Sequence, residues 1–405
     1  MPHISRIRPL NFQKKVINMK LFRAAICALS SLLLLPALCS AQQTVLLDFD
    51  SGTDGTINYT TQMRDDVQSL METIYQDFDF TFTQSAPTTG PFTTITYNSG
   101  TAGGLADGID FRNLNMSDNA VVNVDGLGFT ATDDIVGLSA NIGSHELGHL
   151  VGLRHRDGFG PIGSGVFPGL GGAFFPAFPG PSNASEFENH VLSTPAFGAD
   201  INRFTQPVWL SERSAIKLAF AEDSTTVAEV GANDTLATAQ SLIFGNLVVP
   251  NTIIVGQNAG IGDFDVDAVS VEGSLTAGDN DFFEFTAAAG DLFNFEVMSA
   301  ALDRLDDVDT QISIFDSNGA FVDYFGQDAF NDDEIETLDS VIIDLVIPDD
   351  GTYFIQVNGF AAADTGDYEL FVSRFNGATA VPEPGCVAIL LGACTLIATR
   401  RRRLA

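Results

Sequence analysis

The stretch His145-Glu-Leu-Gly-His-Leu-Val-Gly-Leu-Arg-His155 sets three histidines at fixed spacing in a predicted helix and the turn after it. His145 and His149 are one helical turn apart, so both imidazoles leave the same face and can share a cation. Gly152 can take a positive φ, which ends the helix and turns the chain so that His155 reaches the same ion. Three neutral nitrogen ligands with one open position are typical of a catalytic rather than a structural zinc site.

Glu146 directly follows the first of these histidines. Its carboxylate can reach a water on the metal rather than the metal itself, so we predict that Glu146 is the general base of a hydrolytic reaction. A chance cluster of surface or core histidines is the alternative explanation of the motif.

The same stretch matches the HExxHxxGxxH signature and resembles the metzincin clan of zinc endopeptidases. The resemblance implies His145, His149 and His155 as ligands of Zn²⁺, Glu146 as general base and a polypeptide as substrate. It also implies an α+β fold, with a twisted mixed sheet beside the active-site helix. In that clan an antiparallel edge strand before the helix binds the extended substrate. The best candidates for that strand here are Ala120, Val121, Val122, Asn123 and Val124.

Metzincins also place a methionine turn beneath the zinc, and this chain departs from that pattern. No methionine occurs between Met116 and Met298. The segment His190-Val-Leu-Ser-Thr-Pro195 has the right character and distance, and it puts Leu192 in the position of the methionine. Leucine can supply a similar apolar floor.

Charged and polar residues around the motif have two interpretations each. His190 is either a substrate-contacting residue or a turn histidine bonded to backbone, and the second is favoured. Asp157 is either an anchor for an imidazole or the cleft wall, or a solvated loop acid. We expect Arg154 and Arg156 to pair with local carboxylates rather than to contact substrate.

The rest of residues 42–230 is predicted to be a mixed α/β domain. Apolar and β-branched runs predict strands, and apolar residues at helical spacing predict helices. The expected strands cover residues 44–49, 78–83, 93–97 and 119–125, and the expected helices cover 61–76, 134–153 and 211–221.

Residues 231–376 change character, because short alternating runs replace helical periodicity and predict an all-β sandwich. The clearest runs are 281–286, 292–297, 311–315, 341–346 and 353–357. Motifs such as Gly278-Asp-Asn-Asp-Phe-Phe-Glu-Phe and Gly351-Thr-Tyr-Phe-Ile-Gln-Val resemble the bacterial pre-peptidase C-terminal (PPC) domain. Acidic stretches at 279–281, 303–309 and 331–334 suit either Ca²⁺ sites or a solvated acidic surface, and the second is favoured.

The composition of both ends of the chain predicts export. Residues 1–41 combine a basic head, the apolar run 24–35 and small residues before Gln42, which predicts a signal peptide removed by signal peptidase, with Met19 as an alternative start. Residues 377–405 contain Val381-Pro-Glu-Pro384, a short apolar stretch and four arginines. This segment resembles a PEP-CTERM sorting signal, which implies a short transmembrane helix, transient membrane association and cleavage by an exosortase. An ordinary membrane anchor is the alternative.

Composition limits the function further. The 19 basic and 52 acidic residues give a net charge of −33, which argues against nucleic acid as a partner. All four cysteines lie in the terminal segments, so the folded part of this exported chain has no disulfides.

The histidine motif and the two terminal segments together predict a secreted zinc endopeptidase at the cell envelope or outside the cell. The alternatives are a catalytically idle surface or biofilm-matrix binding protein that keeps its zinc, and a zinc hydrolase acting on a non-peptide envelope polymer.

Overall fold

The computed structural model describes residues 43–200, 205–222, 225–251 and 263–375, and strands make up most of its regular structure. The predicted signal peptide (1–41) and the predicted sorting segment with its transmembrane helix (377–405) lie outside the described residues. Within the described ranges, no helix is both long and apolar enough to cross a membrane.

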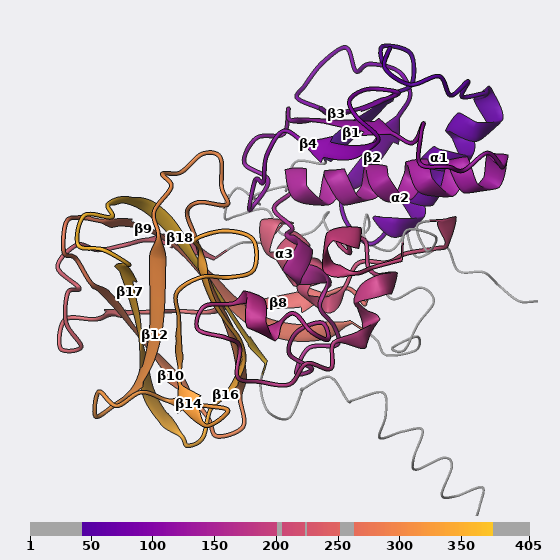
Figure 1. The fold of residues 1–405 in the computed structure, drawn as a ribbon. Helices are drawn as coiled ribbons and strands as arrows, with labels where there is room; N and C mark the ends of the chain where they lie inside the picture. The colour runs from indigo at the N-terminus through magenta and orange to yellow at the C-terminus, as the bar shows by residue number, and fades with distance from the viewer. Residues whose placement is uncertain (1–42, 201–204, 223–224, 252–262, 376–405) are drawn as a thin grey trace, which may run out of the picture. The chain divides into compact units, whose positions relative to one another are not determined.

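A mixed sheet with the strand order β2-β1-β3-β5-β4 forms the centre of the N-terminal region (Figure 1). Its strands are β1 (Gln43–Asp48), β2 (Phe80–Thr83), β3 (Thr93–Tyr97), β4 (Gly103–Ala106) and β5 (Asn119–Asn123). β1, β2, β3 and β5 are parallel, and β4 is antiparallel to β5. Every second residue of β3 is buried, so the predicted period-two alternation is confirmed there.

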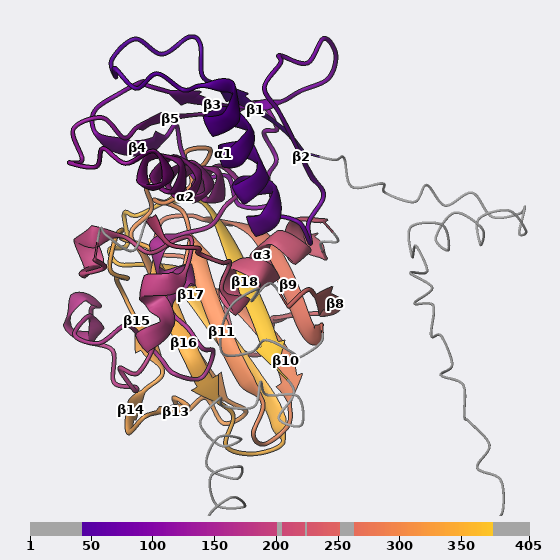
Figure 2. The same cartoon turned by 90° about the vertical axis from the view of Figure 1, so that its right-hand side faces the viewer.

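Two helices, α1 (Thr61–Ile74) and α2 (Thr132–Leu150), pack together beside this sheet (Figure 2). α1 begins where the Thr60 hydroxyl accepts a hydrogen bond from the Met63 N–H at 3.3 Å, as expected of an N-cap. Most of α2 is buried, and the Tyr75 hydroxyl at the end of α1 donates to the Ser144 carbonyl of α2 at 2.7 Å. The helix that carries His145 and His149 is therefore largely buried and is hydrogen-bonded to the end of α1.

The predicted substrate-binding edge strand is not at the edge of the sheet. Ala120–Asn123 belong to β5, which lies between β3 and β4 and is parallel to β3, and Val124 lies just beyond the strand. β4 is the antiparallel edge strand, and it was not predicted from the sequence. Its sequence Gly-Gly-Leu-Ala has no β-branched or aromatic residue, so it has no local strand signal.

The C-terminal region is a sandwich of two sheets with a shared apolar core (Figure 2). One sheet has the order β15-β12-β17-β10-β7, and the other has the order β16-β11-β18-β9-β6 with β8 also paired to β9. The strands are β6 (Thr226–Ala228), β7 (Gln240–Ser241), β8 (Gly245–Val249), β9 (Phe264–Leu275), β10 (Asp281–Ala287), β11 (Leu292–Met298), β12 (Thr310–Asp316), β15 (Phe330–Asn331), β16 (Ser340–Val346), β17 (Gly351–Gly359) and β18 (Gly366–Phe375), with a separate hairpin of β13 (Asp323–Tyr324) and β14 (Gln327–Asp328). The five clearest predicted runs are confirmed as β10, β11, β12, β16 and β17.

The segment between the two regions is mostly irregular and contains short 3₁₀ helices and one α-helix. These are η2 (His155–Gly158), η3 (Gly171–Ala173), η4 (Ser185–Asn189), η5 (Pro195–Phe197) and α3 (Glu212–Glu222). Phe220 of α3 packs against Phe371 of β18, with the ring centroids 4.9 Å apart. Apolar packing is therefore continuous from the N-terminal sheet into the sandwich, and one buried cluster contains residues of both.

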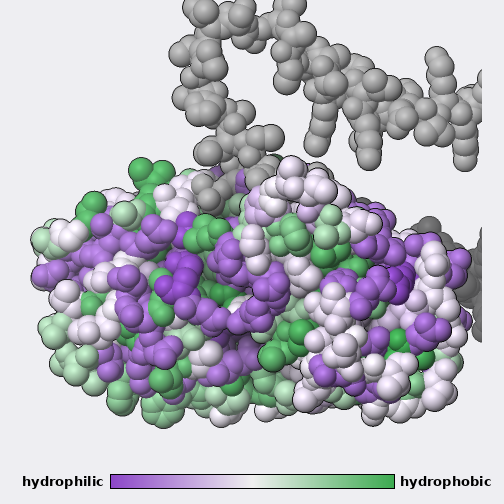
Figure 3. Space-filling model, turned by 90° about the horizontal axis from the view of Figure 1, so that it is seen from above, coloured by the Kyte–Doolittle hydropathy of each residue, from purple (hydrophilic) through white to green (hydrophobic). Residues whose placement is uncertain are grey.

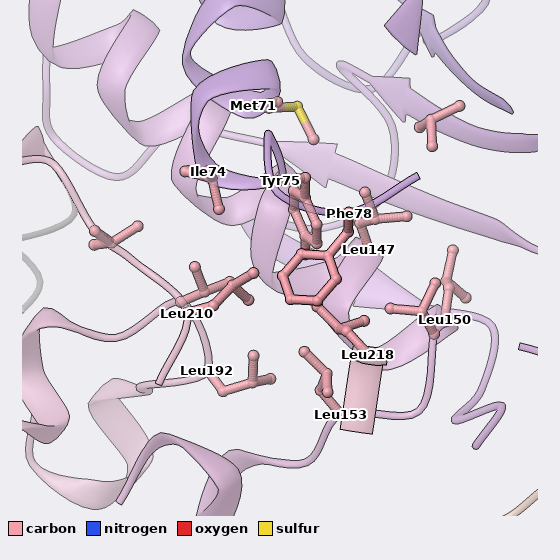
Figure 4. Packing of buried hydrophobic residues seen from close by; sticks show 14 of the residues in the cluster. Met71, Ile74, Tyr75, Phe78, Leu147, Leu150, Leu153, Leu192, Leu210 and Leu218 are labelled. Atoms are coloured by element: carbon pink, nitrogen blue, oxygen red, sulfur yellow. The ribbon is translucent and has the colours of Figure 1, made fainter. Parts of the chain in front are cut away.

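Figure 4 shows part of this cluster, with Leu192 and Leu210 on one side, Leu147 and Leu150 on the other, and Leu153 and Leu218 between them. The face seen in Figure 3 is mixed instead, with hydrophilic, near-neutral and hydrophobic residues interspersed over it. Several charged side chains near the three histidines, among them Arg154 and Asp157, lie inside the protein instead.

Candidate metal centre

Three histidine side chains converge at the end of α2. His145 and His149 are on the last turns of this helix and His155 is on η2, and their ligand nitrogens all lie within 4.8 Å of one another. The Nε2 atom of His145 is 3.1 Å from Nε2 of His155 and 3.2 Å from Nε2 of His149. Tetrahedral coordination with metal–nitrogen bonds of 2.0–2.1 Å requires nitrogens about 3.3 Å apart, so this spacing fits a single metal ion.

Gly152 makes this convergence possible, as the sequence predicted. Its φ is +91°, and its N–H donates to the His149 carbonyl at 2.9 Å, which closes the end of α2. A Cβ at this position would lie 2.4 Å from the Cα of Phe111. Glycine is therefore required both by the left-handed backbone and by the close approach of the neighbouring chain.

The other ring nitrogen of each histidine is also engaged. Nδ1 of His145 donates to the Val191 carbonyl at 2.8 Å, and Nδ1 of His149 donates to the Leu153 carbonyl at 2.9 Å. Nδ1 of His155 contacts the Glu336 carboxylate, which comes from the sandwich. Because every Nδ1 faces an acceptor, the tautomer that leaves Nε2 unprotonated is favoured on all three rings, as metal binding requires.

The environment of the motif shifts two pKa values. Burial lowers the pKa of His149 to about 4, which keeps this imidazole neutral and able to ligate at pH 7. Burial raises the pKa of Glu146 to about 7, although the Ala106 N–H and the charge of His155 oppose that change. Glu146 is 6% exposed and lies beside the ligands, as expected from its position in the motif.

A cavity of about 590 Å³ opens over the three histidines. The strand residues along one side come from β4, and Leu127, Leu138 and Ile142 give the wall an apolar character. The Glu146 carboxylate rests against Gly104 of β4, where an added Cβ would lie 2.2 Å from its Oε1. β4, rather than the predicted β5, is therefore the strand that borders the site.

Leu192 is fully buried below the last turn of α2 (Figure 4). A Cβ on Gly148 would lie 3.1 Å from Cδ2 of Leu192, and the carbonyl of the preceding Val191 accepts the hydrogen bond from His145. The turn thus supplies both an apolar floor and an acceptor for the first ligand. His190 in the same turn contacts the Gly158 carbonyl through Nδ1, as favoured from the sequence.

The charged neighbours of His155 along the chain, Arg154, Arg156 and Asp157, are buried, and their partners are mostly distant in sequence. Arg154 pairs with Glu334 and with Asp339, the latter at 2.9 Å. The expectation that Arg154 and Arg156 pair with carboxylates is confirmed, but the predicted local partners are wrong, because both arginines pair with acids of the sandwich.

Asp157 is neither an anchor for an imidazole nor a solvated acid. It is 4% exposed, and it accepts hydrogen bonds from the Arg154 N–H at 2.7 Å and from Lys217 at 2.8 Å. Lys217 and Arg156 also pair with Glu296 of β11. Burial alone would raise the pKa of Glu296, but these cations and Arg154 lower it to about 2, so the carboxylate is ionised.

The hypothesis of calcium sites in the sandwich gains no geometric support. Among the described residues, only the three histidines form a group of three or more side chains placed to hold an ion. Two of the acids involved have other partners, since Glu334 pairs with Arg154 and Asp281 accepts the Tyr368 hydroxyl at 2.8 Å.

No protein-family model and no curated protein matches the chain. Solved structures that match include PliG of Aeromonas hydrophila, a periplasmic inhibitor of g-type lysozyme, at 15% identity over 37% of this chain and 98% of that chain, with a TM-score of 0.22. They also include the pre-peptidase C-terminal domain of collagenase from Bacillus anthracis, at 18% identity over 26% of this chain and 87% of that chain, with a TM-score of 0.20. TM-scores this low carry no weight for fold or function.

Proposed function

We propose that this protein is an exported zinc-dependent endopeptidase of the metzincin kind. The proposal depends on one observation, namely that three Nε2 atoms converge beside a buried glutamate at the floor of a cavity bordered by an antiparallel edge strand. His145, His149 and His155 would hold the metal. Three imidazole ligands with a position left open are the donor set of hydrolytic zinc sites. Zinc, when bound, supplies a Lewis acid that polarises a carbonyl and makes water more acidic.

The residues of the chain account for the other requirements of peptide hydrolysis. In the described structure β4 pairs with β5 on one side only, so its other side can accept an extended peptide as an added strand. The apolar cavity wall excludes solvent from the bound peptide. Glu146 takes a proton from the attacking water and delivers it to the leaving amine. Its position against Gly104 directs the carboxylate into the cavity.

Export is proposed from the sequence alone. A signal peptide at 1–41 and a sorting segment at 377–405 would bring the protein through signal peptidase and an exosortase to the envelope or beyond. The acidic composition and the absence of cysteine between the two signals suit a folded part that is stabilised by packing and ion pairs.

Removal of the metal should abolish turnover reversibly. The purified protein, incubated with unfolded proteins and peptide libraries, is expected to cleave internal bonds, to lose this activity after chelation and to regain it when stoichiometric Zn²⁺ is restored. Mass spectrometry of the products and metal analysis of the protein give the two measurements. Stoichiometric zinc without cleavage would support the idle binding protein instead, and a protein that binds no zinc would contradict the metal centre.

Replacement of Gly104 by alanine should displace the general base. The new Cβ would overlap the Glu146 carboxylate, and a displacement of about 1 Å typically costs roughly 100-fold in rate. We therefore expect kcat to fall by about 100-fold while the zinc content stays unchanged. Gly172→Ala is the matched control, because a Cβ there meets no atom within 4 Å. Equal kcat values for the two variants would argue against the assigned position of Glu146.

A further inference from the structure

The third ligand differs from the other two in how it is held. His145 and His149 lie on α2, and their Nδ1 atoms donate to backbone carbonyls of Val191 and Leu153. His155 lies outside that helix, its side chain is 23% exposed, and its Nδ1 contacts a carboxylate 181 residues further along the chain. That carboxylate belongs to Glu336, in the loop 332–339 between β15 and β16 of the sandwich.

The loop 332–339 is fixed by a buried carboxylate of its own. Glu334 accepts hydrogen bonds from the backbone N–H groups of Glu336 at 3.2 Å and Thr337 at 3.0 Å. Asp339, at the end of the loop, accepts the N–H groups of Ser299 and Ala300, both at 2.8 Å. These hydrogen bonds tie the backbone on both sides of Glu336 to buried carboxylates.

Arg154 joins this loop to the metal centre. Its guanidinium pairs with Glu334, donates to the Thr337 hydroxyl at 2.9 Å and donates to Asp339 at 2.9 Å. The side chain of Arg154 is 1% exposed, and those of Glu334 and Asp339 are 0% exposed. Since Arg154 directly precedes His155, the same contacts fix the third ligand and the carboxylate that faces it.

We propose that Glu336 is the positioning residue of the third metal ligand, so that the sandwich is a working part of the metal centre. This inference rests on the proposed metal centre. Glu336 accepts the Nδ1 proton of His155, holds the ring so that Nε2 points at the metal, and increases the electron density on the ligating nitrogen. A carboxylate behind a ligating imidazole has this effect in metal sites generally.

The sandwich supplies the hydrogen-bond acceptor of the third ligand through the loop 332–339. Without the loop 332–339, two ligands would keep their backbone acceptors and the third would lose its acceptor. Metal affinity should therefore depend on a residue far from the signature motif in sequence. The sandwich also supplies Glu336 and Thr337 to the cavity lining, so its loop borders the space above the metal.

Zinc affinity of full-length protein variants tests this role directly. Glu336→Ala should weaken zinc binding by about 10–100-fold, measured by competition with a chromophoric chelator. Glu336→Gln should lose less, because its amide oxygen can still accept the Nδ1 proton. Asp333→Asn, which removes one charge from the same loop, is the matched control and should bind zinc like the wild type.

Urea unfolding of the metal-free proteins separates positioning from general stability. The midpoint of Glu336→Ala should stay near that of the wild type, because the ion pairs of Arg154 are untouched. If the wild type binds zinc tightly and Glu336→Ala binds it equally tightly, the role proposed for Glu336 is wrong, and the proposed function is unaffected. A similar loss of zinc affinity in Asp333→Asn would also overturn the role proposed for Glu336. So would a lower urea midpoint of metal-free Glu336→Ala than of metal-free wild type. A wild type that binds zinc but cleaves no peptide would contradict the endopeptidase and leave the role of Glu336 standing.

Discussion

Glu146→Ala is expected to lower kcat/KM for peptide hydrolysis by about 10²–10⁴-fold, the usual contribution of a positioned general base. Glu146 is buried beside three converging histidines and faces the cavity, whereas the ligand nitrogens belong to other residues. Loss of its carboxylate removes the proton acceptor and leaves the ligand set intact. Steady-state kinetics on a cleaved peptide, together with metal analysis, measure both quantities.

Two further variants make this result interpretable. Glu146→Gln keeps the size of the side chain but cannot accept the proton, so it should lose nearly as much activity as the alanine variant. Glu72→Gln, on the exposed face of α1, should retain full activity. An active Glu146→Gln variant would show that another group takes the proton. Loss of zinc in the Glu146 variants would mean that the glutamate contributes to the metal site.

Arg154→Met is expected to destabilise the metal-free protein by about 3–5 kcal/mol, the range found when one partner of a buried ion pair is removed. Arg154 lies in the interior with two carboxylates whose side chains have no exposed surface. The substitution leaves Glu334 and Asp339 buried without their main cation. Equilibrium unfolding in urea, with a chelator present to exclude any contribution of the metal, gives the free energy directly.

An arginine with an exposed ion pair is the control, and it shows whether the loss of stability depends on burial of the pair. Arg64 pairs with Asp50 at the surface, where the side chains are 25% and 73% exposed, so Arg64→Met should leave the unfolding midpoint close to that of the wild type. Replacing Glu334 and Asp339 by their amides in the Arg154→Met background should restore part of the lost stability, because no charge is then buried without a partner. An Arg154→Met protein as stable as the wild type would contradict the buried network.

Local features of the chain were predicted well. The spacing of His145 and His149 needs only helical geometry, and the turn to His155 needs only a glycine that tolerates a positive φ. The alternating runs of the sandwich also form strands. Successive side chains of a strand point to opposite faces, so a half-buried strand alternates apolar and polar residues. In each case the residues that form the sequence pattern also form the helix, turn or strand that it predicts.

The missed features all depend on contacts between distant segments. β4 carries two glycines and forms a strand only because it pairs with β5. Arg154 was expected to pair with local carboxylates, but its partners Glu334 and Asp339 come from the sandwich. Asp157 is buried through its ion pair with Lys217 of α3, which is 60 positions away. Glu336 was one acid among many in an acidic region, with no pattern to distinguish it.

The sequence by itself determined that His145, His149 and His155 converge, that Glu146 lies beside them and that the chain turns at Gly152, because helix periodicity and glycine dihedral angles are local properties. Only the tertiary structure decided which strand borders the cavity and which carboxylate faces the third ligand. Buried ion pairs join residues far apart in the chain, such as Arg154 and Asp339, which are 185 positions apart. These pairs depend on which distant segments pack together in the folded chain, so no local sequence pattern predicts them.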